Sequence, residues 1–424
     1  MKYSVVTFGC RVNQADSLGF EEELIAHGAT LSSTEDADLV IVNTCSVTAN
    51  ADQAARQTIR RTHRVNPYAR IVVTGCYATR RPEEVGELPN VTHVVPNVQK
   101  ADVIRLAVQP FERTTTATRY GTGDGACGSA IAPGLAGRTA FTLRVQTGCA
   151  ESCSYCIIPA TRGTPQSVPP DRVLLDVERV AAAGFKEIAL TGVHLGSYGR
   201  DRDSQSSLHD LLLRLDAWNR CREGKAVLFR VSSLEPMDCT PDIVTLVAQS
   251  SSFAPHFHLP LQHASNRMLA AMRRPYTREF YDTLVNDICE RIPDASIGSD
   301  VIVGFPGETD ADVAALVACL EQSPLTHLHV FPYSDRPGTV ASTLRDRPDP
   351  SAVRERAARV REIGRVLTSR FHARQIGRRH RALTIEDGSL AVTGNYLKVR
   401  IPEARPRNEW VHLQITAPGQ AVLI

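Results

Sequence analysis

The sequence predicts an α/β protein in three parts: an N-terminal open parallel α/β sheet domain, a central partial (βα)6 barrel and a C-terminal small β-barrel. Up to about residue 375, short β-rich runs alternate with amphipathic stretches, which is typical of parallel sheets. From about residue 380 the apolar residues follow a period of two, with Gly and Pro between the runs, which indicates short antiparallel strands. A chain of 424 residues, 42% of them hydrophobic, can bury several cores.

Residues 1–112 are expected to form the open sheet, with strands near 4–8, 39–43, 71–75 and 92–95 and helices near 15–27 and 49–65. Three of these strands are followed directly by a cysteine, namely Cys10, Cys45 and Cys76. Ligands of open α/β sheets bind at the carboxyl ends of the strands, so the three thiols can converge on one point. Any one of them alone is better explained as a buried core residue. Three equivalent positions favour a metal site with one open ligand position.

Residues 113–139 are rich in Gly, Ala, Thr and Ser and lack periodicity, so they are expected to be a flexible linker. Cys127 lies in this segment, and we interpret its thiol as incidental.

The central part is expected over residues 140–375. Strands are predicted near 140–147, 187–193, 227–234, 256–261, 297–305 and 327–333, and helices near 171–183, 208–218, 241–249, 278–292, 310–322 and 351–375. Six such units are fewer than the eight of a closed barrel, so this barrel should be open on one side. An open side admits a large substrate.

A second cysteine group, Cys149, Cys153 and Cys156, follows the first barrel strand in the spacing C-x3-C-x2-C. The active sites of such barrels lie at this end of the strands. Structural zinc sites normally fill four positions with paired ligands, and no second pair follows here. An iron–sulfur cluster with one open iron fits the spacing better, with zinc or buried thiols as the alternative. The other cysteines of the barrel region, Cys221, Cys239, Cys289 and Cys319, have no mutual spacing and are interpreted as structural.

Eleven cysteines without a secretory leader favour a reducing compartment, and we expect the protein to be cytoplasmic. The apolar run at residues 3–8 is too short for a signal peptide, and no apolar stretch of about 18 residues predicts a membrane span.

Basic residues gather near the C-terminal end, although the net charge of the chain is only +2. The segment 344–381 is dense in arginine, and Arg354, Arg361 and Arg365 can share one helix face that suits phosphates. A solvated basic helix is the alternative. The final part, residues 376–424, is expected to be the small β-barrel, an architecture that often binds nucleic acid.

The segment around the second triplet, residues 145–159 (VQTGCAESCSYCIIP), resembles the radical S-adenosylmethionine (SAM) superfamily, with Tyr155 before the last cysteine. Together with the strand-end cysteines and the terminal barrel, nearly the whole chain resembles the methylthiotransferase family. The supporting motifs are residues 7–14 (TFGCRVNQ), 42–45 (VNTC), 190–199 (LTGVHLGSYG), 230–236 (RVSSLEP), 300–309 (DVIVGFPGET) and 331–339 (FPYSDRPGT). The terminal barrel is similar to RNA-binding TRAM domains.

Within that family, the strings GCRVNQ, TGVHLGSYG and TGNY (residues 393–396) are most similar to the branch that methylthiolates carbon 2 of N6-threonylcarbamoyladenosine at position 37 of tRNA. Residues 261–265 (LQHAS) depart toward the branch that modifies an aspartate of a small-subunit ribosomal protein. The open alternatives are therefore that protein substrate, isopentenyladenosine tRNA or, in a different class, a metal-containing RNA-binding protein without catalysis.

The resemblance implies two 4Fe-4S clusters as cofactors. A radical SAM cluster would lie on Cys149, Cys153 and Cys156 and an auxiliary cluster on Cys10, Cys45 and Cys76. SAM would be both the radical source and the methyl donor. The implied partners are the anticodon region of tRNA, a sulfur donor and an electron donor such as flavodoxin or ferredoxin, with no membrane.

Candidate contacts to SAM follow the barrel strands. Gly192 suits close backbone approach, and Ser232, Glu235 and Gln262 offer polar groups. The remaining candidates are Tyr155 beside the triplet and Asp300 on the fifth strand, which is a candidate for either SAM or substrate. For Gly192 a plain turn, and for Glu235 and Asp300 an ion pair, are the alternatives.

Overall fold

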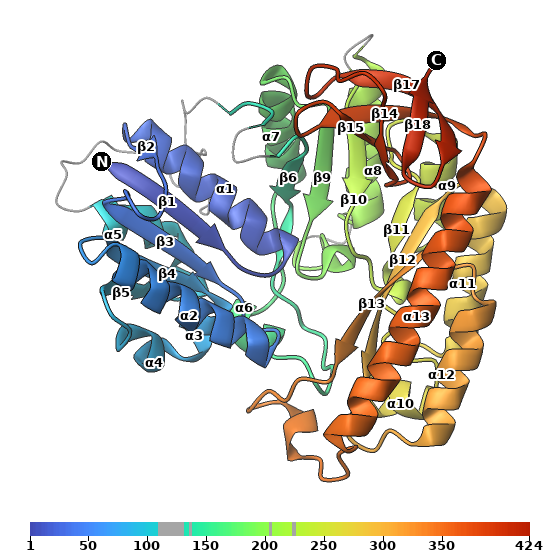
Figure 1. Cartoon of the computed structure of the whole chain (residues 1–424), viewed down its shortest axis with the longest axis horizontal. Coiled ribbons are helices and arrows are strands. Elements are labelled where there is room, and N and C mark those ends of the chain that lie inside the picture. The colour runs from blue at the N-terminus through green and yellow to red at the C-terminus, as the bar shows by residue number, and fades with distance from the viewer. Residues whose placement is uncertain (109–130, 135–137, 203–205, 223–225) are drawn as a thin grey trace.

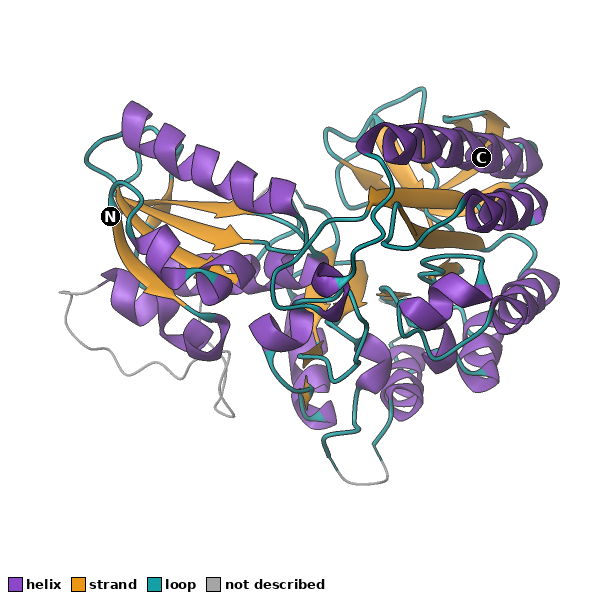
Figure 2. Cartoon of the chain, turned by 90° about the horizontal axis from the view of Figure 1, so that it is seen from below, coloured by secondary structure: helices purple, strands orange, loops and turns teal. Residues whose placement is uncertain are grey.

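The computed structural model describes residues 1–108, 131–134, 138–202, 206–222 and 226–424 (Figure 1). Most of the expected linker, with Cys127, lies outside the described residues. The N-terminal sheet and the barrel form two bodies whose loops meet between them (Figure 2).

The N-terminal part is a parallel five-stranded sheet in the order β2-β1-β3-β4-β5, which confirms the expected open sheet. Its central strand β3 is buried at all six residues because helices cover both faces of the sheet. The short strand β2 and the short helices α3 and α4 were not predicted, since they are too brief to show periodicity. The strands are β1 (Lys2–Thr7), β2 (Thr30–Leu31), β3 (Leu39–Thr44), β4 (Arg70–Gly75) and β5 (Val91–Val95), and the helices are α1 (Arg11–Ala26), α2 (Ala49–Val65), α3 (Cys76–Arg80), α4 (Pro82–Gly86) and α5 (Val103–Val108).

The central part contains six parallel strands in two three-stranded sheets, β6-β9-β10 and β11-β12-β13, as expected for a partial barrel. The sheets meet where the amide of Phe229 donates to the Ser252 carbonyl at 2.8 Å. The strands are β6 (Phe141–Arg144), β9 (Glu187–Thr191), β10 (Leu228–Val231), β11 (His256–His258), β12 (Ser296–Val303) and β13 (His327–Pro332). The main helices around them are α7 (Pro170–Ala182), α8 (Leu208–Arg220), α9 (Pro241–Gln249), α11 (Arg278–Arg291), α12 (Asp310–Gln322) and α13 (Pro350–Gln375).

The first barrel strand is shorter than the predicted 140–147. It ends at Arg144, and Gln146 and Thr147 form β7 (Gln146–Thr147), which pairs antiparallel with β8 (Gln166–Ser167). Short helices flank the loops at α6 (Ile158–Arg162) and α10 (Asn266–Ala271). The chain thus leaves the sheet just before the second cysteine group.

Alternate residues of the barrel strands face inward. Phe229 and Val231 of β10 pack in the core beneath the helices, so Arg230 between them faces the lumen. The same alternation directs His256 and His258, Asp300, and His327 and His329 into the lumen, because their strand neighbours Phe257, Val301 and Leu328 pack in or against that core.

The terminal strands form a closed barrel in the order β14-β15-β16-β18-β17, with its own apolar core, as expected. The strands are β14 (Arg379–Ile385), β15 (Leu390–Thr393), β16 (Lys398–Arg400), β17 (Trp410–Ala417) and β18 (Gln420–Leu423). This terminal barrel lies over the amino ends of the strands of the central barrel (Figure 1), where the Asn408 side chain donates to the Gly184 carbonyl at 2.8 Å and the Asn395 side chain donates to the Asp294 carbonyl at 2.9 Å. Over the described residues, no helix has the length and apolar character required to cross a membrane.

Candidate active site with two cysteine triplets

The first triplet, Cys10, Cys45 and Cys76, lies at the carboxyl ends of β1, β3 and β4. Two glycines allow the close approach. Gly9 has φ +87°, and a Cβ there would lie 2.6 Å from the Cys45 Sγ, while a Cβ on Gly75, at φ +96°, would lie 2.2 Å from the Thr44 carbonyl oxygen. The structure therefore brings together the three thiols that the strand ends predicted.

Asn13 fixes the start of α1 against the ends of the strands. Its Nδ2 donates to the carbonyls of Phe8 at 2.7 Å and Thr44 at 2.9 Å, and it is fully buried. Cys10 is the N-cap residue of α1 and makes no side-chain cap hydrogen bond, so its thiol is free to act as a ligand.

Buried charges surround this triplet. Arg162 reaches from the barrel to Cys76 and to Asp16 of α1, with 3.3 Å between its Nη1 and the Asp16 Oδ2, and Lys100 donates to the same oxygen at 2.7 Å. Burial opposes the Asp16 carboxylate, but Lys100, Arg144 and Arg162 hold its pKa well below the ordinary value.

The same cations give two thiols of this triplet different pKa values. Burial raises the pKa of Cys45 to about 12. Burial alone would also raise the pKa of Cys76, but the Arg162 guanidinium and the Lys100 ammonium lower it below its ordinary value. The site thus carries positive charge that can balance deprotonated thiols and an anionic cluster.

The second triplet occupies the loop between β7 and α6. The Cys149 Sγ accepts from the amide of Glu151 at 3.4 Å and lies 3.7 Å from the His194 Nδ1. The Cys153 Sγ accepts from the Arg274 Nη1 at 3.2 Å. Burial raises the pKa of Cys156 to about 12, and the neighbouring Cys153 and Cys149 add to this effect. A bound metal would favour the deprotonated form of the Cys156 thiol.

Two ion pairs hold the side chains that touch this triplet. The His194 Nε2 is 2.7 Å from the Asp238 Oδ2, and although burial opposes the imidazolium, Asp238 and Cys149 raise the pKa of His194 to about 9. Arg274 pairs with Glu235 while its Nε donates to the Tyr276 hydroxyl at 3.0 Å. Both pairs place a positive group against a cysteine.

Both triplets fit a multi-iron cluster better than a single ion. A tetrahedral zinc ion with bonds of about 2.3 Å holds its sulfurs roughly 4 Å apart. Among the described residues, His258, Asp300 and His329 have ligand atoms that all lie within 4.8 Å of one another. The sulfur atoms of neither cysteine triplet are all this close together. All six thiols are free of disulfides. Wider spacing of three free thiols is what an iron–sulfur cluster requires.

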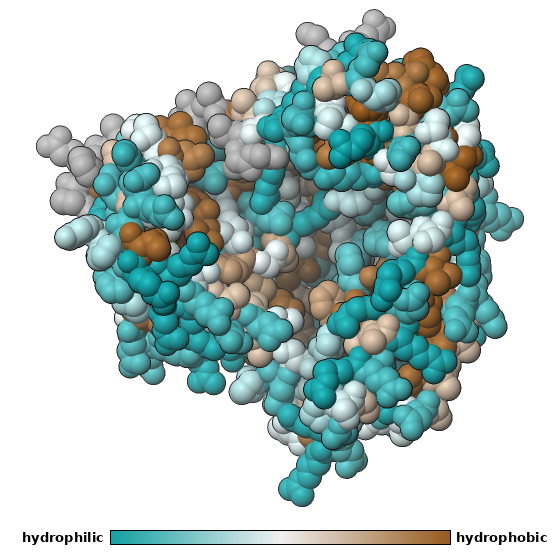
Figure 3. All heavy atoms as spheres, in the orientation of Figure 1, coloured by the Kyte–Doolittle hydropathy of each residue, from teal (hydrophilic) through white to brown (hydrophobic). Residues whose placement is uncertain are grey.

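Helix α6 joins the two triplets. It begins two residues after Cys156 and ends at Arg162, which contacts the first triplet. The Asn97 Nδ2 donates to the Thr161 carbonyl at 2.8 Å, and the amide of Cys149 donates to the Gly163 carbonyl at 3.0 Å. One short segment therefore touches both cysteine groups, and Figure 3 shows the surface hollowed between the bodies that carry them.

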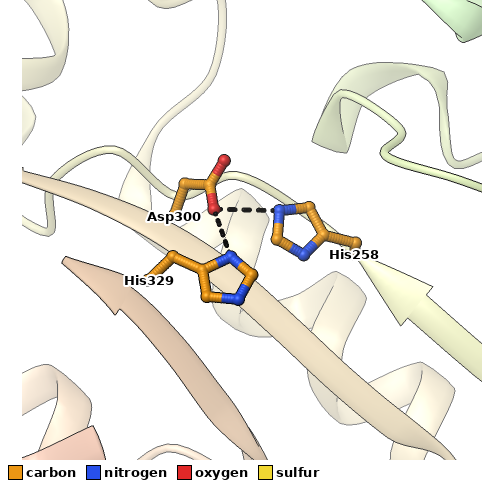
Figure 4. A group of neighbouring side chains, drawn as sticks. All are labelled: His258, Asp300 and His329. Carbon is orange, nitrogen blue, oxygen red and sulfur yellow. Dashed lines mark hydrogen bonds and ion pairs between the residues drawn. The ribbon is translucent and has the colours of Figure 1, made fainter. Parts of the chain in front are cut away.

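The lumen holds a hydrogen-bonded triad on three adjacent strands (Figure 4). The Asp300 Oδ1 accepts from the His258 Nε2 at 3.0 Å and from the His329 Nδ1 at 3.1 Å. Burial opposes the Asp300 carboxylate, but the two imidazoles hold its pKa well below the ordinary value. Asp300 therefore orients two rings in the lumen, and the three side chains form a donor set that can also hold a metal ion.

The remaining candidate contacts lie around the lumen in different settings. Gly192 is packed against Gln146, whose Oε1 would lie 2.9 Å from a Cβ. The Ser232 Oγ is buried without a hydrogen-bond partner among the described residues, which leaves it available to a ligand. Gln262 has φ +63°, and its backbone N–H donates to the backbone carbonyl of Asp300 at 2.9 Å. Tyr155 packs edge-on against Phe305.

Sequence reasoning missed the charged residues that serve the cysteines, chiefly Arg162, Arg274 and His194. Their partners are distant along the chain, and Arg162 and Asp16 are 146 residues apart. The only local signal was the position of Arg162, six residues after Cys156, and of His194 in a quoted motif.

The other predicted features are placed as follows. Cys221 is exposed, Cys289 is intermediate, and Cys239 and Cys319 are buried, all on or beside helices of the barrel. Arg354, Arg361 and Arg365 lie on the exposed side of α13.

A family model described as an uncharacterized protein family, UPF0004, matches residues 2–96, and the radical SAM superfamily matches residues 143–320. The chain is 36% identical to a threonylcarbamoyladenosine tRNA methylthiotransferase, MtaB, of Aquifex aeolicus, over 94% of this chain and 96% of that protein. It is 34% identical to the MtaB of Bacillus subtilis, over 86% and 80%. It is 32% identical to a tRNA-2-methylthio-N(6)-dimethylallyladenosine synthase of Thermobifida fusca, over 91% and 78%.

Among solved structures, the radical SAM methyltransferase TsrM of Kitasatospora setae, with cobalamin and a [4Fe-4S] cluster bound, matches with a TM-score of 0.58. That match covers 80% of this chain and 76% of that chain at 16% sequence identity, and it therefore concerns the fold.

Proposed function

Because this chain belongs to the methylthiotransferase family of radical SAM enzymes, we propose that it methylthiolates carbon 2 of N6-threonylcarbamoyladenosine at position 37 of tRNA. The relatives that support this substrate are the MtaB proteins, which match over most of the chain at up to 36% identity. The observation that carries the proposal is the pairing of two cysteine triplets across α6, each with a buried arginine.

We assign an auxiliary 4Fe-4S cluster to Cys10, Cys45 and Cys76 and the radical SAM 4Fe-4S cluster to Cys149, Cys153 and Cys156. When bound, the clusters and SAM would supply the one-electron chemistry, the sulfur and the methyl group. Replacing an unactivated C–H bond of adenine by a methylthio group requires all three. Arg162 and Arg274 offset the negative charge of the thiolates, and the His194–Asp238 pair orients a donor toward Cys149.

For SAM itself we propose contacts from the lumen and its rim, with Gly192, Ser232, Glu235, Gln262, Asp300 and Tyr155 as candidates. Ser232 is the best supported, because its buried hydroxyl lacks a partner among the described residues. Glu235 already pairs with Arg274, so its proposed role is to position that arginine near Cys153.

We propose that the terminal barrel and the exposed arginines of α13 bind the anticodon region of the tRNA. Phosphate contacts from arginines would make this binding weaken as salt rises. We further propose cytoplasmic action, with a separate electron donor and sulfur donor. The proposed division of the chain is 1–112, 113–139, 140–375 and 376–424.

The ribosomal-protein alternative has less support from the structure. His263, at the centre of the LQHAS string that motivated it, is fully buried. Its Nδ1 accepts from the Ser265 amide at 2.9 Å and its Nε2 lies 3.4 Å from Glu308. A residue held in this way serves the barrel wall instead of a substrate.

The test is mass spectrometry of nucleosides from threonylcarbamoyladenosine tRNA after anaerobic incubation with reconstituted protein, SAM, reductant and sulfide. We expect the 2-methylthio derivative together with 5'-deoxyadenosine. If 5'-deoxyadenosine forms without it, the assigned substrate is wrong. Parallel reactions with isopentenyladenosine tRNA and the small-subunit ribosomal protein would then identify the true one.

A further inference from the structure

A cavity of about 420 Å³ lies where the three parts of the chain meet. This volume is in the range of small-ligand sites. One wall comes from α1, a second from the amino-terminal halves of β6 and β9, and a third from the small barrel. The lining residues are Arg11, Gln14, Arg138, Thr139, Ala140, Thr142, Glu187, Ala189, Leu383, Ile385, Val392 and Tyr396.

Two guanidinium groups face this cavity. The Arg11 Nη2 donates to the Tyr396 hydroxyl at 3.2 Å, and the Arg138 Nη1 donates to the Gln14 Oε1 at 3.2 Å. Within the described residues neither arginine has a carboxylate within 4.0 Å. The two cations are close enough for Arg11 to oppose the charge of Arg138. Like charges in a cavity that form no ion pair with a carboxylate favour an anionic ligand.

Two acids lie nearby, and neither neutralises the pair. The Glu187 carboxylate is engaged by Arg230 at 2.9 Å and 3.2 Å. Burial raises the pKa of Glu21 to about 7, against the opposing effect of Arg138, so this acid is only partly charged near neutral pH. The cavity therefore keeps a net positive character.

The loop that carries Tyr396 is rigidly held. The Arg230 Nη1 donates to the Gly394 carbonyl at 2.9 Å, and the Asn395 Nδ2 donates to the Asp294 carbonyl at 2.9 Å and to the Gln375 side chain at 3.1 Å. Tyr396 itself has φ +68°, a conformation that is unfavourable for a bulky residue. Such strain persists where surrounding contacts fix it, often at ligand sites.

The cavity also unites two motifs that are far apart in the sequence. Arg11 and Gln14 belong to GCRVNQ, and Tyr396 belongs to TGNY, which are two of the three strings that distinguished the branch in the sequence. Arg11 directly follows Cys10 in the chain, so one wall of the cavity is covalently continuous with the first cysteine triplet. Under the proposed function, a ligand group bound by Arg11 would be anchored one residue away from a cluster ligand.

We propose that this three-part cavity binds the carboxylate of the N6-threonylcarbamoyl group of the substrate nucleoside, with Arg11 as its main contact. This inference rests on the proposed function. A guanidinium can grip a carboxylate through two parallel hydrogen bonds. Tyr396 and Arg138 position that group, and Leu383, Ile385 and Val392 form an apolar wall beside it. An uncharged dimethylallyl substituent would leave the two cations without a partner, so the cavity selects the acidic substituent.

The test compares two tRNA substrates that differ only in this group: the threonylcarbamoyl acid and its primary amide. The readout is kcat/KM for formation of the 2-methylthio product. Wild-type protein should prefer the acid by roughly 10- to 100-fold, the range expected for hydrogen bonds to a charged group. Arg11→Gln should lose that preference by slowing the acid alone, and Tyr396→Phe should reduce it in part.

Arg61→Gln, on the exposed side of α2, is the matched control and should keep the wild-type preference. Iron content and 5'-deoxyadenosine formation show whether Arg11→Gln still carries its clusters. If it does not, Arg138→Gln, on a different segment, replaces it. Equal rates of wild-type protein on acid and amide, or an equal loss on both substrates in the variants, would overturn the inference and leave the proposed function standing. No product on either substrate would instead reject the proposed function.

Discussion

The two cysteine triplets are built in opposite ways. Cys149, Cys153 and Cys156 lie within eight residues of one loop, whereas Cys10, Cys45 and Cys76 come from three strands of one sheet. The single-loop triplet depends on local chain geometry. The strand-end triplet depends on the correct order and register of β1, β3 and β4.

Their charged neighbours differ in the same sense. Arg162 pairs with Asp16 where both side chains are almost fully buried, at 2% and 0% exposure, and it connects the barrel to the N-terminal sheet. Arg274 is also buried, but its partner Glu235 retains 24% exposure. The ion pair of Arg162, which links the two parts of the chain, is therefore more fully buried than the ion pair of Arg274 beside the single loop. Its charges cost more to desolvate.

The largest expected effect comes from removing one cysteine of each triplet. Cys45→Ser should abolish methylthio transfer, by roughly a thousandfold or more as for loss of one member of a catalytic unit, while leaving 5'-deoxyadenosine formation in place. Cys153→Ser should abolish both. Liquid chromatography of both products checks this, and loss of 5'-deoxyadenosine in Cys45→Ser would show that the two sites are not separable.

Replacing the buried arginine of each site should lower the free energy of unfolding by different amounts. Arg162→Met leaves Asp16 with less compensation and should lower the free energy of unfolding by about 3–5 kcal/mol. Arg274→Met should cost about 1–3 kcal/mol, because Glu235 can turn to water. Urea unfolding under argon measures both, with Arg61→Met as the control, and equal losses would contradict the distinction.

Two glycines next to the triplets provide a smaller test. Gly9→Ala would place a Cβ 2.5 Å from the Cys45 Cβ at φ +87°, so we expect about half of the bound iron to be lost. Gly163 has φ +71° and ψ −163°, a conformation that is nearly restricted to glycine, but nothing lies within 4 Å of a Cβ there, so Gly163→Ala should cost about 1–3 kcal/mol and keep the iron. Iron analysis decides, and full iron in Gly9→Ala would show that the first triplet tolerates displacement.

The last effect appears only as the pH changes, and it concerns α1, the helix whose N-cap is Cys10. Burial raises the pKa of Glu21 on α1 from 4.5 to about 7, with Arg138 opposing this shift. The folded state therefore binds the Glu21 proton more tightly than the unfolded state does. The protonated carboxyl contributes its full stabilisation of the fold below pH 4.5, and this contribution is lost as the pH rises through 7.

Glu21→Gln should consequently gain stability relative to wild type as the pH rises from 4.5 to 8. The gain is at most about 3 kcal/mol, at about 1.4 kcal/mol per pKa unit. Urea unfolding at several pH values measures the difference, and a difference that does not change with pH would refute the raised pKa.

Much of the fold was predictable because it is encoded locally. The helices α2, α9 and α12 match the predicted bounds, since their apolar periodicity and their Thr N-caps are visible in the sequence. In the terminal barrel, the period-two alternation predicts a strand over residues 396–401, and this prediction is partly wrong. The strand β16 covers only Lys398–Arg400, because Tyr396 turns at positive φ to meet Arg11, a contact 385 residues away in sequence.

The sequence by itself determined the three-part α/β organisation and the six cysteines, because periodicity, strand-end position and C-x3-C-x2-C spacing are properties of short segments. Only the tertiary structure decided which charged and polar groups come together around the cysteines, in the lumen and in the cavity. Arg162 reaches Asp16, Asp300 gathers His258 and His329, and Arg11 meets Tyr396, each through contacts between residues distant along the chain. Such contacts are fixed by how sheets and barrels pack, and no local pattern records them.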